Sequence, residues 1–259
     1  MSSLRISHYV ARTSCEGPGE RAALWVSGCS LQCPGCCNPE LFDPRAGESI
    51  EISALVETLA AEKAGATREG LSVLGGEPLD QGEALADFLT ALRARRPRWG
   101  IIVFTGYRAR ELILRPGWER LRRLVDTFVA GPFEAKELEP VHGGRRFIGS
   151  LNQSLEHMSP RYREDALWRG PRRAELHIDA RGGVSVHGDP ELTRRVRRRL
   201  RLVSSTAAGV QPRLGLPLET GLGSQAKVDV AGESDMTPAI DPPSVDAISS
   251  GVEKHPTAR

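Results

Sequence analysis

Four short apolar segments rich in branched residues alternate with longer segments that carry a helical pattern. The apolar segments are residues 22–27, 71–74, 101–105 and 127–130, and the helical patterns span residues 53–63, 82–95 and 118–125. A crossover between parallel strands needs about a dozen residues, so this rhythm predicts a parallel sheet covered by helices, an α/β fold. Ligands of such sheets bind beyond the carboxyl ends of the strands. The motifs that follow Ser27, Leu74, Thr105 and Ala130 are therefore expected to meet at one edge.

The segments after the last of these strands carry weaker signals. Residues 132–147 are rich in glycine, proline and charge and predict a long loop. Residues 172–186 predict a hairpin that turns at Arg181-Gly182-Gly183. Residues 190–203 predict a last helix with its apolar residues on one face. The arginines of that helix are interpreted as a solvated face, with contact to an acidic partner as the alternative.

Composition sets the outer limits. Residues 204–259 contain no aromatic residue or cysteine and predict a disordered tail beyond a domain of residues 1–203. The formal net charge is +2, and the arginine run lacks interleaved aromatic residues, so no nucleic-acid partner is predicted. No apolar run is long enough to cross a bilayer, and the amino-terminal residues lack the features of a secretory signal. A cytoplasmic location without membrane contact is therefore expected.

Three of the five cysteines lie within eight residues, directly after the first predicted strand. Cys29, Cys33 and Cys36 form a Cys-x3-Cys-x2-Cys loop in which three thiolates can face one point. In a reducing compartment, such a group indicates a metal or catalytic site rather than disulfides. A [4Fe–4S] cluster held by three thiolates would leave one iron open for chemistry. The alternative is a structural zinc site completed by Cys37, Cys15 or a histidine.

Together with the second strand end, this loop resembles the signature of radical S-adenosylmethionine enzymes. The segment Leu74-Gly75-Gly76-Glu77-Pro78-Leu79 is similar to the one by which that family engages the amino group of the methionine moiety. Four further motifs narrow the resemblance to the activating enzymes of anaerobic ribonucleotide reductase. They are Asn38-Pro39, Thr105-Gly106-Tyr107, the segment Asp126–Phe133 and Gly149-Ser150-Leu151-Asn152-Gln153. The resemblance covers roughly residues 20–155.

The resemblance implies a partial (βα) barrel of the radical S-adenosylmethionine type, with the cluster loop after the first core strand. It implies that Cys29, Cys33 and Cys36 hold a [4Fe–4S] cluster whose open iron is chelated by S-adenosylmethionine. Residues expected to contact the cofactor are Gly35, Cys36, Cys37, Gly75, Gly76 and Glu77. Residues expected at the cofactor or substrate rim are Asn38, Thr105, Tyr107, Asp126, Asn152 and Gln153.

The implied reaction is one-electron cleavage of S-adenosylmethionine to methionine and a 5′-deoxyadenosyl radical. That radical would take a hydrogen atom from a backbone glycine of the large reductase subunit, and a flavodoxin or ferredoxin would supply the electron. Two alternatives stay open: a radical S-adenosylmethionine enzyme that modifies a peptide or small molecule, and a non-catalytic zinc or iron–sulfur module. The Gly75-Gly76-Glu77 segment argues against the module.

Cys37 departs from the family pattern. An aromatic residue often follows the third cluster cysteine in the family, and adenine stacking is expected to differ here. We expect Cys37 to be a buried small residue, with a thiol beside the cluster or a zinc ligand as the alternatives. Cys15 is isolated in a predicted loop, and no role is expected for it.

Overall fold

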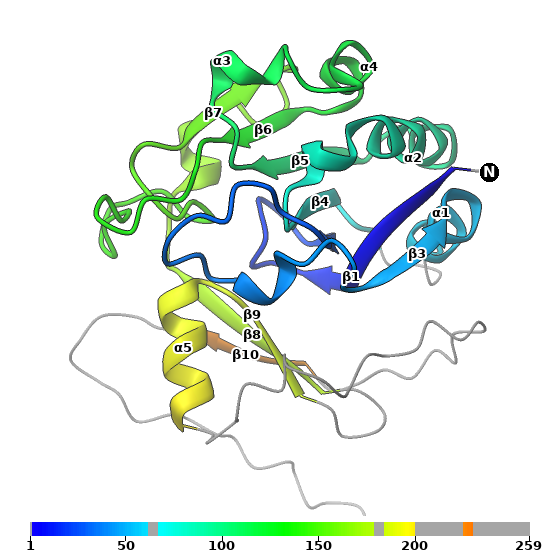
Figure 1. Cartoon of the computed structure of the whole chain (residues 1–259). Coiled ribbons are helices and arrows are strands. Elements are labelled where there is room, and N and C mark those ends of the chain that lie inside the picture. The colour runs from blue at the N-terminus through cyan, green and yellow to red at the C-terminus, as the bar shows by residue number, and fades with distance from the viewer. Residues whose placement is uncertain (1, 62–66, 179–183, 200–224, 230–259) are drawn as a thin grey trace, which may run out of the picture.

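The computed structural model describes residues 2–61, 67–178 and 184–199, and the backbone of residues 225–229. These residues form a seven-stranded sheet with the strand order β3-β1-β2-β4-β5-β6-β7 and a three-stranded sheet with the order β10-β8-β9 (Figure 1). No helix within these ranges is both long and apolar enough to span a membrane.

Four neighbouring strands at the centre of the large sheet run parallel. They are β2 (Arg21–Val26), β4 (Gly70–Gly75), β5 (Gly100–Thr105) and β6 (Thr127–Ala130). All residues of β2 and β6 are buried, as expected for parallel strands that are covered on both faces. The predicted mixed α/β fold with a mostly parallel central sheet is therefore confirmed.

Helices cover one face of this sheet (Figure 1). They are α1 (Ile52–Ala60), α2 (Gly82–Arg95) and α4 (Trp118–Leu124), close to the predicted ranges. Their buried leucines pack against Leu24, Leu71 and Val103 of the strands in one large apolar core. Short turns of helix complete the domain: η1 (Pro39–Leu41), η2 (Pro78–Gln81), α3 (Ala109–Leu112) and η3 (Asp165–Trp168).

Three antiparallel strands extend the sheet beyond what the sequence pattern predicted. They are β1 (Ser3–Thr13), β3 (Glu48–Glu51) and β7 (Ser154–His157). Their side chains are largely half-buried or exposed, so they lack the continuous apolar run that identified the central strands. Strands β3 and β7 are the two edges, so the sheet is open in the described part of the chain.

The predicted carboxyl-terminal hairpin is present as β8 (Arg173–Ile178) and β9 (Val184–Gly188), although its turn lies outside the described residues. Helix α5 (Pro190–Arg199) follows, and Leu192 packs against β8 and β9. One strand lies within residues 204–259, for which a disordered tail was expected. Strand β10 (Gln225–Asp229) pairs with β8, because the exposed edge of a hairpin offers unpaired main-chain groups to a further strand. The rest of residues 204–259 lies outside the described part.

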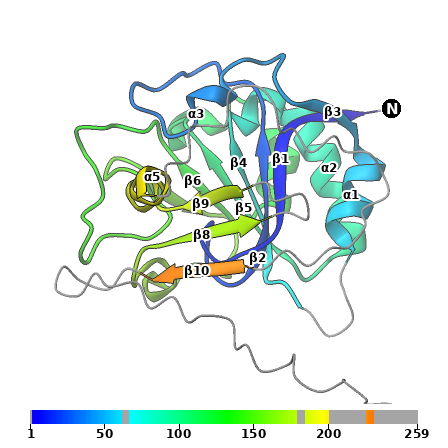
Figure 2. The ribbon, with the colours of Figure 1, turned by 90° about the horizontal axis from the view of Figure 1, so that it is seen from below.

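The small sheet packs on the face of the large sheet that the helices leave open (Figure 2). Successive residues of a strand point to opposite faces, so Leu24 joins the helix-covered core while Trp25 points the other way. The Trp25 ring stacks on His8 at 4.5 Å and contacts His187 of β9 at 5.0 Å between ring centroids. The Glu175 carboxylate of β8 accepts hydrogen bonds from the main chain and hydroxyl of Ser14.

Candidate functional site

The cysteine loop starts where β2 ends and closes on itself at the end of η1. The main-chain N–H of Gly28 donates to the carbonyl oxygen of Leu41 at 2.9 Å, which ties the base of the loop. Gln32 and Gly35 have φ values of 44° and 77°. Glycine adopts this left-handed backbone readily and glutamine does not, and both positions lie between Cys29 and Cys36. The three predicted ligands are therefore held on one compact segment at the carboxyl edge of the sheet.

The thiols of this loop accept hydrogen bonds from its own N–H groups. Cys29, Cys33 and Cys36 are unpaired and partly exposed. Burial raises the pKa of Cys29, and two main-chain N–H groups that donate to its sulfur oppose that shift. The Cys37 thiol donates to the sulfur of Cys36 and lowers the pKa of Cys36 to about 7. The main-chain N–H of Asn38 adds a further bond to the Cys36 sulfur at 3.4 Å.

These donors fit an iron–sulfur cluster. Iron is held in such clusters by thiolates, and hydrogen bonds to the sulfurs tune the cluster. All three cysteines of the loop are partly exposed to solvent. Among the described residues, no three His, Cys, Asp or Glu side chains are gathered closely enough to hold a single metal ion.

The other two cysteines differ from each other in burial. Cys37 is exposed, so the expectation that it is a buried small residue is wrong; its thiol lies beside that of Cys36 instead. Cys15 is buried, and its Cβ lies close to Gly188 of the small sheet. The structure therefore gives Cys15 a packing position between the two sheets.

The Gly75-Gly76-Glu77 turn lies against the base of the cysteine loop. A Cβ atom on Gly76 would come within 2.1 Å of the Gly28 carbonyl oxygen, so only glycine permits this approach. Gly75 has a φ of 112°, which also favours glycine. The main-chain N–H of Glu77 donates to the same Gly28 oxygen at 2.8 Å. The turn after β4 and the loop after β2 are thus joined directly.

The Glu77 side chain points into the protein. It is 1 % exposed, and its carboxylate accepts hydrogen bonds at 2.8 Å from the N–H groups of Leu79 and Gly106 and from the hydroxyl of Thr105. Burial raises the pKa of Glu77 to about 7. This carboxylate connects the ends of β4 and β5. Thr105 therefore lies at the predicted rim, where its hydroxyl donates to Glu77.

An exposed carboxylate on the next turn reaches the cysteine loop. Asp80 of η2 accepts from the main-chain N–H of Ser30 at 2.7 Å, from the Ser30 hydroxyl at 2.9 Å and from the Tyr107 hydroxyl at 2.8 Å. The two hydroxyl oxygens are 3.1 Å apart. Tyr107 was predicted at this rim, but Asp80 and Ser30 were not. Their positions in the sequence could have indicated them. Asp80 directly follows the Gly-Gly-Glu-Pro-Leu segment, and Ser30 directly follows Cys29.

Asn152 and Gln153 brace the segment that follows β6. The Gln153 amide donates to the carbonyl oxygen of Gly131 at 3.0 Å and accepts from the N–H of Gly149 at 3.0 Å. The Asn152 amide donates to the carbonyl oxygen of Pro132 at 2.8 Å. The ends of β2, β4, β5 and β6 therefore meet at one edge, and that prediction is confirmed.

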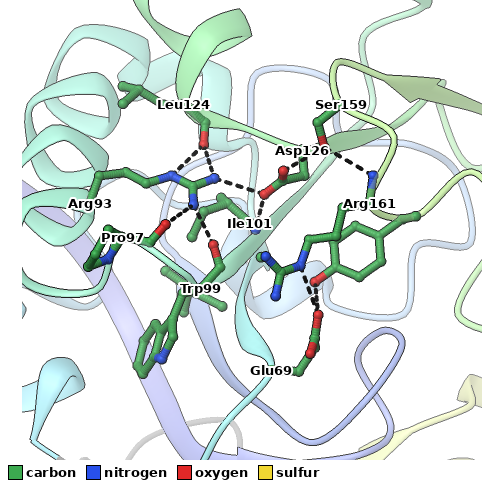
Figure 3. Close-up of polar contacts among 12 residues, drawn as sticks. Glu69, Arg93, Pro97, Trp99, Ile101, Leu124, Asp126, Ser159 and Arg161 are labelled. Carbon is green, nitrogen blue, oxygen red and sulfur yellow. Dashed lines mark hydrogen bonds and ion pairs between the residues drawn. The ribbon is translucent and has the colours of Figure 1, made fainter.

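Asp126 is the exception among the predicted rim residues. It directly precedes β6 and therefore lies at the amino-terminal ends of the parallel strands, away from the cysteine loop. Its carboxylate accepts from Arg93 and from the main-chain N–H of Ile101, both at 2.8 Å, and from the Ser159 hydroxyl at 2.6 Å (Figure 3). The sequence motif could not reveal this position of Asp126. The Asp-x4-Gly-Pro-Phe segment spans the whole length of β6, and only its second half reaches the rim.

Comparison with known proteins fits this geometry. Residues 15–156, more than half of the chain, match the family described as 4Fe-4S single cluster domain. The chain belongs to this family.

The relatives that this chain matches carry a more specific name. The anaerobic ribonucleoside-triphosphate reductase-activating protein of Salmonella typhi is 30% identical over 159 residues, which cover 60% of this chain and 99% of that protein. The protein of the same name from Escherichia coli K12 is 30% identical over 146 residues, covering 55% and 91%. The one from Enterobacteria phage T4 is 30% identical over 122 residues, covering 46% and 74%. The predicted resemblance to the activating proteins is therefore confirmed.

Proposed function

We propose that this chain is a radical S-adenosylmethionine enzyme that generates a glycyl radical on an anaerobic ribonucleotide reductase. The observation that carries the proposal is the joining of the three-cysteine loop to the Gly75-Gly76-Glu77 turn at one edge of the sheet. The names of its relatives support the reductase as the protein substrate. A domain of residues 1–203, folded as a partial (βα) barrel in the cytoplasm, is part of the same proposal.

In this proposal Cys29, Cys33 and Cys36 hold the [4Fe–4S] cluster. The main chain around Gly75 and Gly76 receives the amino group of S-adenosylmethionine, since carbonyl oxygens at a strand end suit an ammonium group. When bound, the cluster and cofactor together supply the electron transfer and the hydrogen-abstracting radical. The task of the chain is to bind and orient both groups.

The remaining residues of the edge surround that site. Gly35, Cys36 and Cys37 lie on the loop beside the cofactor. The buried Glu77 carboxylate joins the ends of β4 and β5. Asn38, Thr105, Tyr107, Asn152 and Gln153 form the rim that the protein substrate approaches. An electron donor of the flavodoxin or ferredoxin type completes the set of partners.

The proposal is tested by anaerobic iron–sulfur reconstitution followed by electron paramagnetic resonance of the reduced protein, with and without S-adenosylmethionine. The expected result is a [4Fe–4S] signal that changes when the cofactor is added. Cys33→Ala should abolish the signal. A stable zinc site, or a cluster indifferent to the cofactor, would refute the radical mechanism.

The substrate is tested separately. The loaded, reduced protein is incubated with S-adenosylmethionine and the large subunit of an anaerobic ribonucleotide reductase from the same source. A glycyl-radical signal on the large subunit, absent with Cys33→Ala, supports the activase. Cofactor cleavage without that signal favours the alternative, a peptide or small-molecule substrate.

A further inference from the structure

The cysteine loop is tied to the neighbouring strand ends by one exposed side chain. Both the N–H and the hydroxyl of Ser30 donate to the Asp80 carboxylate, one to each oxygen. Tyr107, from the end of β5, donates to the oxygen that also accepts from the Ser30 hydroxyl. A single carboxylate therefore connects three segments: the start of the cysteine loop, the turn after β4 and the segment after β5.

Asp80 is itself held in a fixed position. It lies on η2, whose residues Pro78 and Leu79 are buried, and the Glu77 carboxylate accepts from the N–H of Leu79 at the start of this turn. The next residue, Gln81, donates to the carbonyl oxygen of Arg5 at 3.0 Å and accepts from its N–H at 2.8 Å. The turn is thus anchored to β1 as well as to β4, so the Asp80 carboxylate is presented to the loop from a rigid base.

Ser30 follows Cys29 directly, so fixing both donors of Ser30 limits the freedom of the Cys29 thiol. Bonds from N–H and O–H groups to an ionised acceptor are stronger than those between neutral partners. Bonding two groups of one residue to both oxygens also fixes direction, as a single bond would not. Stacking of the Arg115 guanidinium on the Tyr107 ring, at 4.2 Å from its centroid, restrains the third donor.

We propose that Asp80 is a positioning residue for the iron–sulfur site, which holds the cysteine loop in its ligand-ready form through Ser30 and Tyr107. The inference rests on the proposed function, because it assumes that Cys29 is a cluster ligand. It assigns to Asp80 no contact with the cluster or with S-adenosylmethionine.

The first measurement uses the protein without metal. Hydrogen exchange is followed in peptides that cover residues 29–36 for the wild type and for Asp80→Ala. Loss of a charge-assisted bond at this exposed site should speed exchange of these amides roughly fivefold. The matched control is Asp43→Ala, another exposed aspartate near the loop. Among the described residues its side chain bonds only to Arg45, so this variant should leave exchange unchanged. Equal exchange in Asp80→Ala and wild type would overturn the proposal.

The second measurement uses the reconstituted protein. Iron release to a ferrous chelator under anaerobic conditions should be several times faster in Asp80→Ala, with a broadened electron paramagnetic resonance signal. Asp80→Asn keeps one acceptor oxygen and should fall between wild type and Asp80→Ala, a graded rescue that general destabilisation would not give. Identical release rates and spectra in all three proteins would overturn the proposal.

A milder variant covers the case in which Asp80→Ala fails to fold. Tyr107→Phe removes the tyrosine hydroxyl, with its bonds to Asp80 and Ser30, and leaves both bonds of Ser30 to Asp80, so it should shift exchange and iron release in the same direction by less. No shift with Tyr107→Phe, while the protein remains folded, would refute the part assigned to Tyr107. If the wild type takes up no cluster at all, the proposed function fails, and the exchange experiment still decides whether Asp80 orders the loop.

Discussion

Asp126 provides the sharpest test of how the structure reassigns a residue that the sequence placed at the active rim. Its side chain is 12% exposed and its partner Arg93 is 23% exposed, so both charges are largely removed from water. Removing one member of a buried ion pair leaves the other charge uncompensated, at a cost of about 3–5 kcal/mol. Arg93 keeps the carbonyl oxygens of Leu124 and Trp99 as acceptors (Figure 3), which favours the lower end of this range.

Asp126→Ala also leaves the buried N–H of Ile101 without an acceptor. We therefore expect Asp126→Ala to lower the free energy of unfolding by about 3 kcal/mol. Asp126→Asn retains one oxygen for Arg93 and Ile101, and its amide can donate to Ser159, so its loss should be about 1 kcal/mol. The measurement is urea unfolding of the reduced, metal-free protein, followed by circular dichroism.

The controls separate bracing from a role at the cofactor site. Reconstituted Asp126→Asn should bind as much iron as the wild type and show the same change of signal with S-adenosylmethionine. If the free energy of unfolding of Asp126→Ala lies within about 0.5 kcal/mol of that of the wild type, the bracing role of Asp126 is refuted. Intact stability together with a lost cofactor response would return Asp126 to the active rim.

Three further predictions concern the edge and the small sheet. Gly76→Ala should displace the cysteine loop and reduce the iron bound after reconstitution, because its Cβ would lie 2.1 Å from the Gly28 oxygen; full iron binding would contradict this. Burial raises the pKa of Glu77 from 4.5 to about 7, so the folded state binds the proton more tightly than the unfolded state. Relative to Glu77→Gln, the wild type should lose roughly 3 kcal/mol of unfolding free energy as the pH rises from 4.5 to 7, and parallel pH profiles would exclude it. Burial lowers the pKa of His8 to about 4 and that of His187 to about 3, so the free energy of unfolding should fall as the pH drops below 6.5. His187→Phe should weaken that pH dependence, which is measured by unfolding at pH 7 and pH 4.5.

The central fold could be predicted because its signals are local. Each parallel strand is a short apolar run, and each helix between them is an amphipathic stretch of the right length, so periodicity alone located α2 (Gly82–Arg95) and β6 (Thr127–Ala130). Strands β1 and β10 could not be found this way. Their place depends on a free edge that other strands offer, which is a property of the assembled sheet.

The same distinction between local sequence signals and contacts made only in the fold applies to the site. The cysteine loop and its glycines were recognisable because their residue types at fixed spacing serve a particular chemistry. The partners of Asp80 were not, since Ser30 and Tyr107 are separated from it by 50 and 27 positions and each alone is an ordinary surface residue. Asp126 was misplaced for the opposite reason: it belongs to a recognisable motif that runs from one edge of the sheet to the other.

Two carboxylates of one turn divide the work of holding this edge. Glu77 is buried and accepts from the N–H groups of Leu79 and Gly106 and from the Thr105 hydroxyl, so it ties the ends of β4 and β5 together. Asp80 is exposed and bonds to the loop that, in the proposed function, admits a cluster, a cofactor and a protein partner. A buried carboxylate in that second position would resist movement of the loop, because each broken bond would leave an unsatisfied charge. In water such bonds are exchanged at little cost. The exposure of Asp80 is therefore suited to the role proposed for the loop, which is to be ordered and still admit ligands.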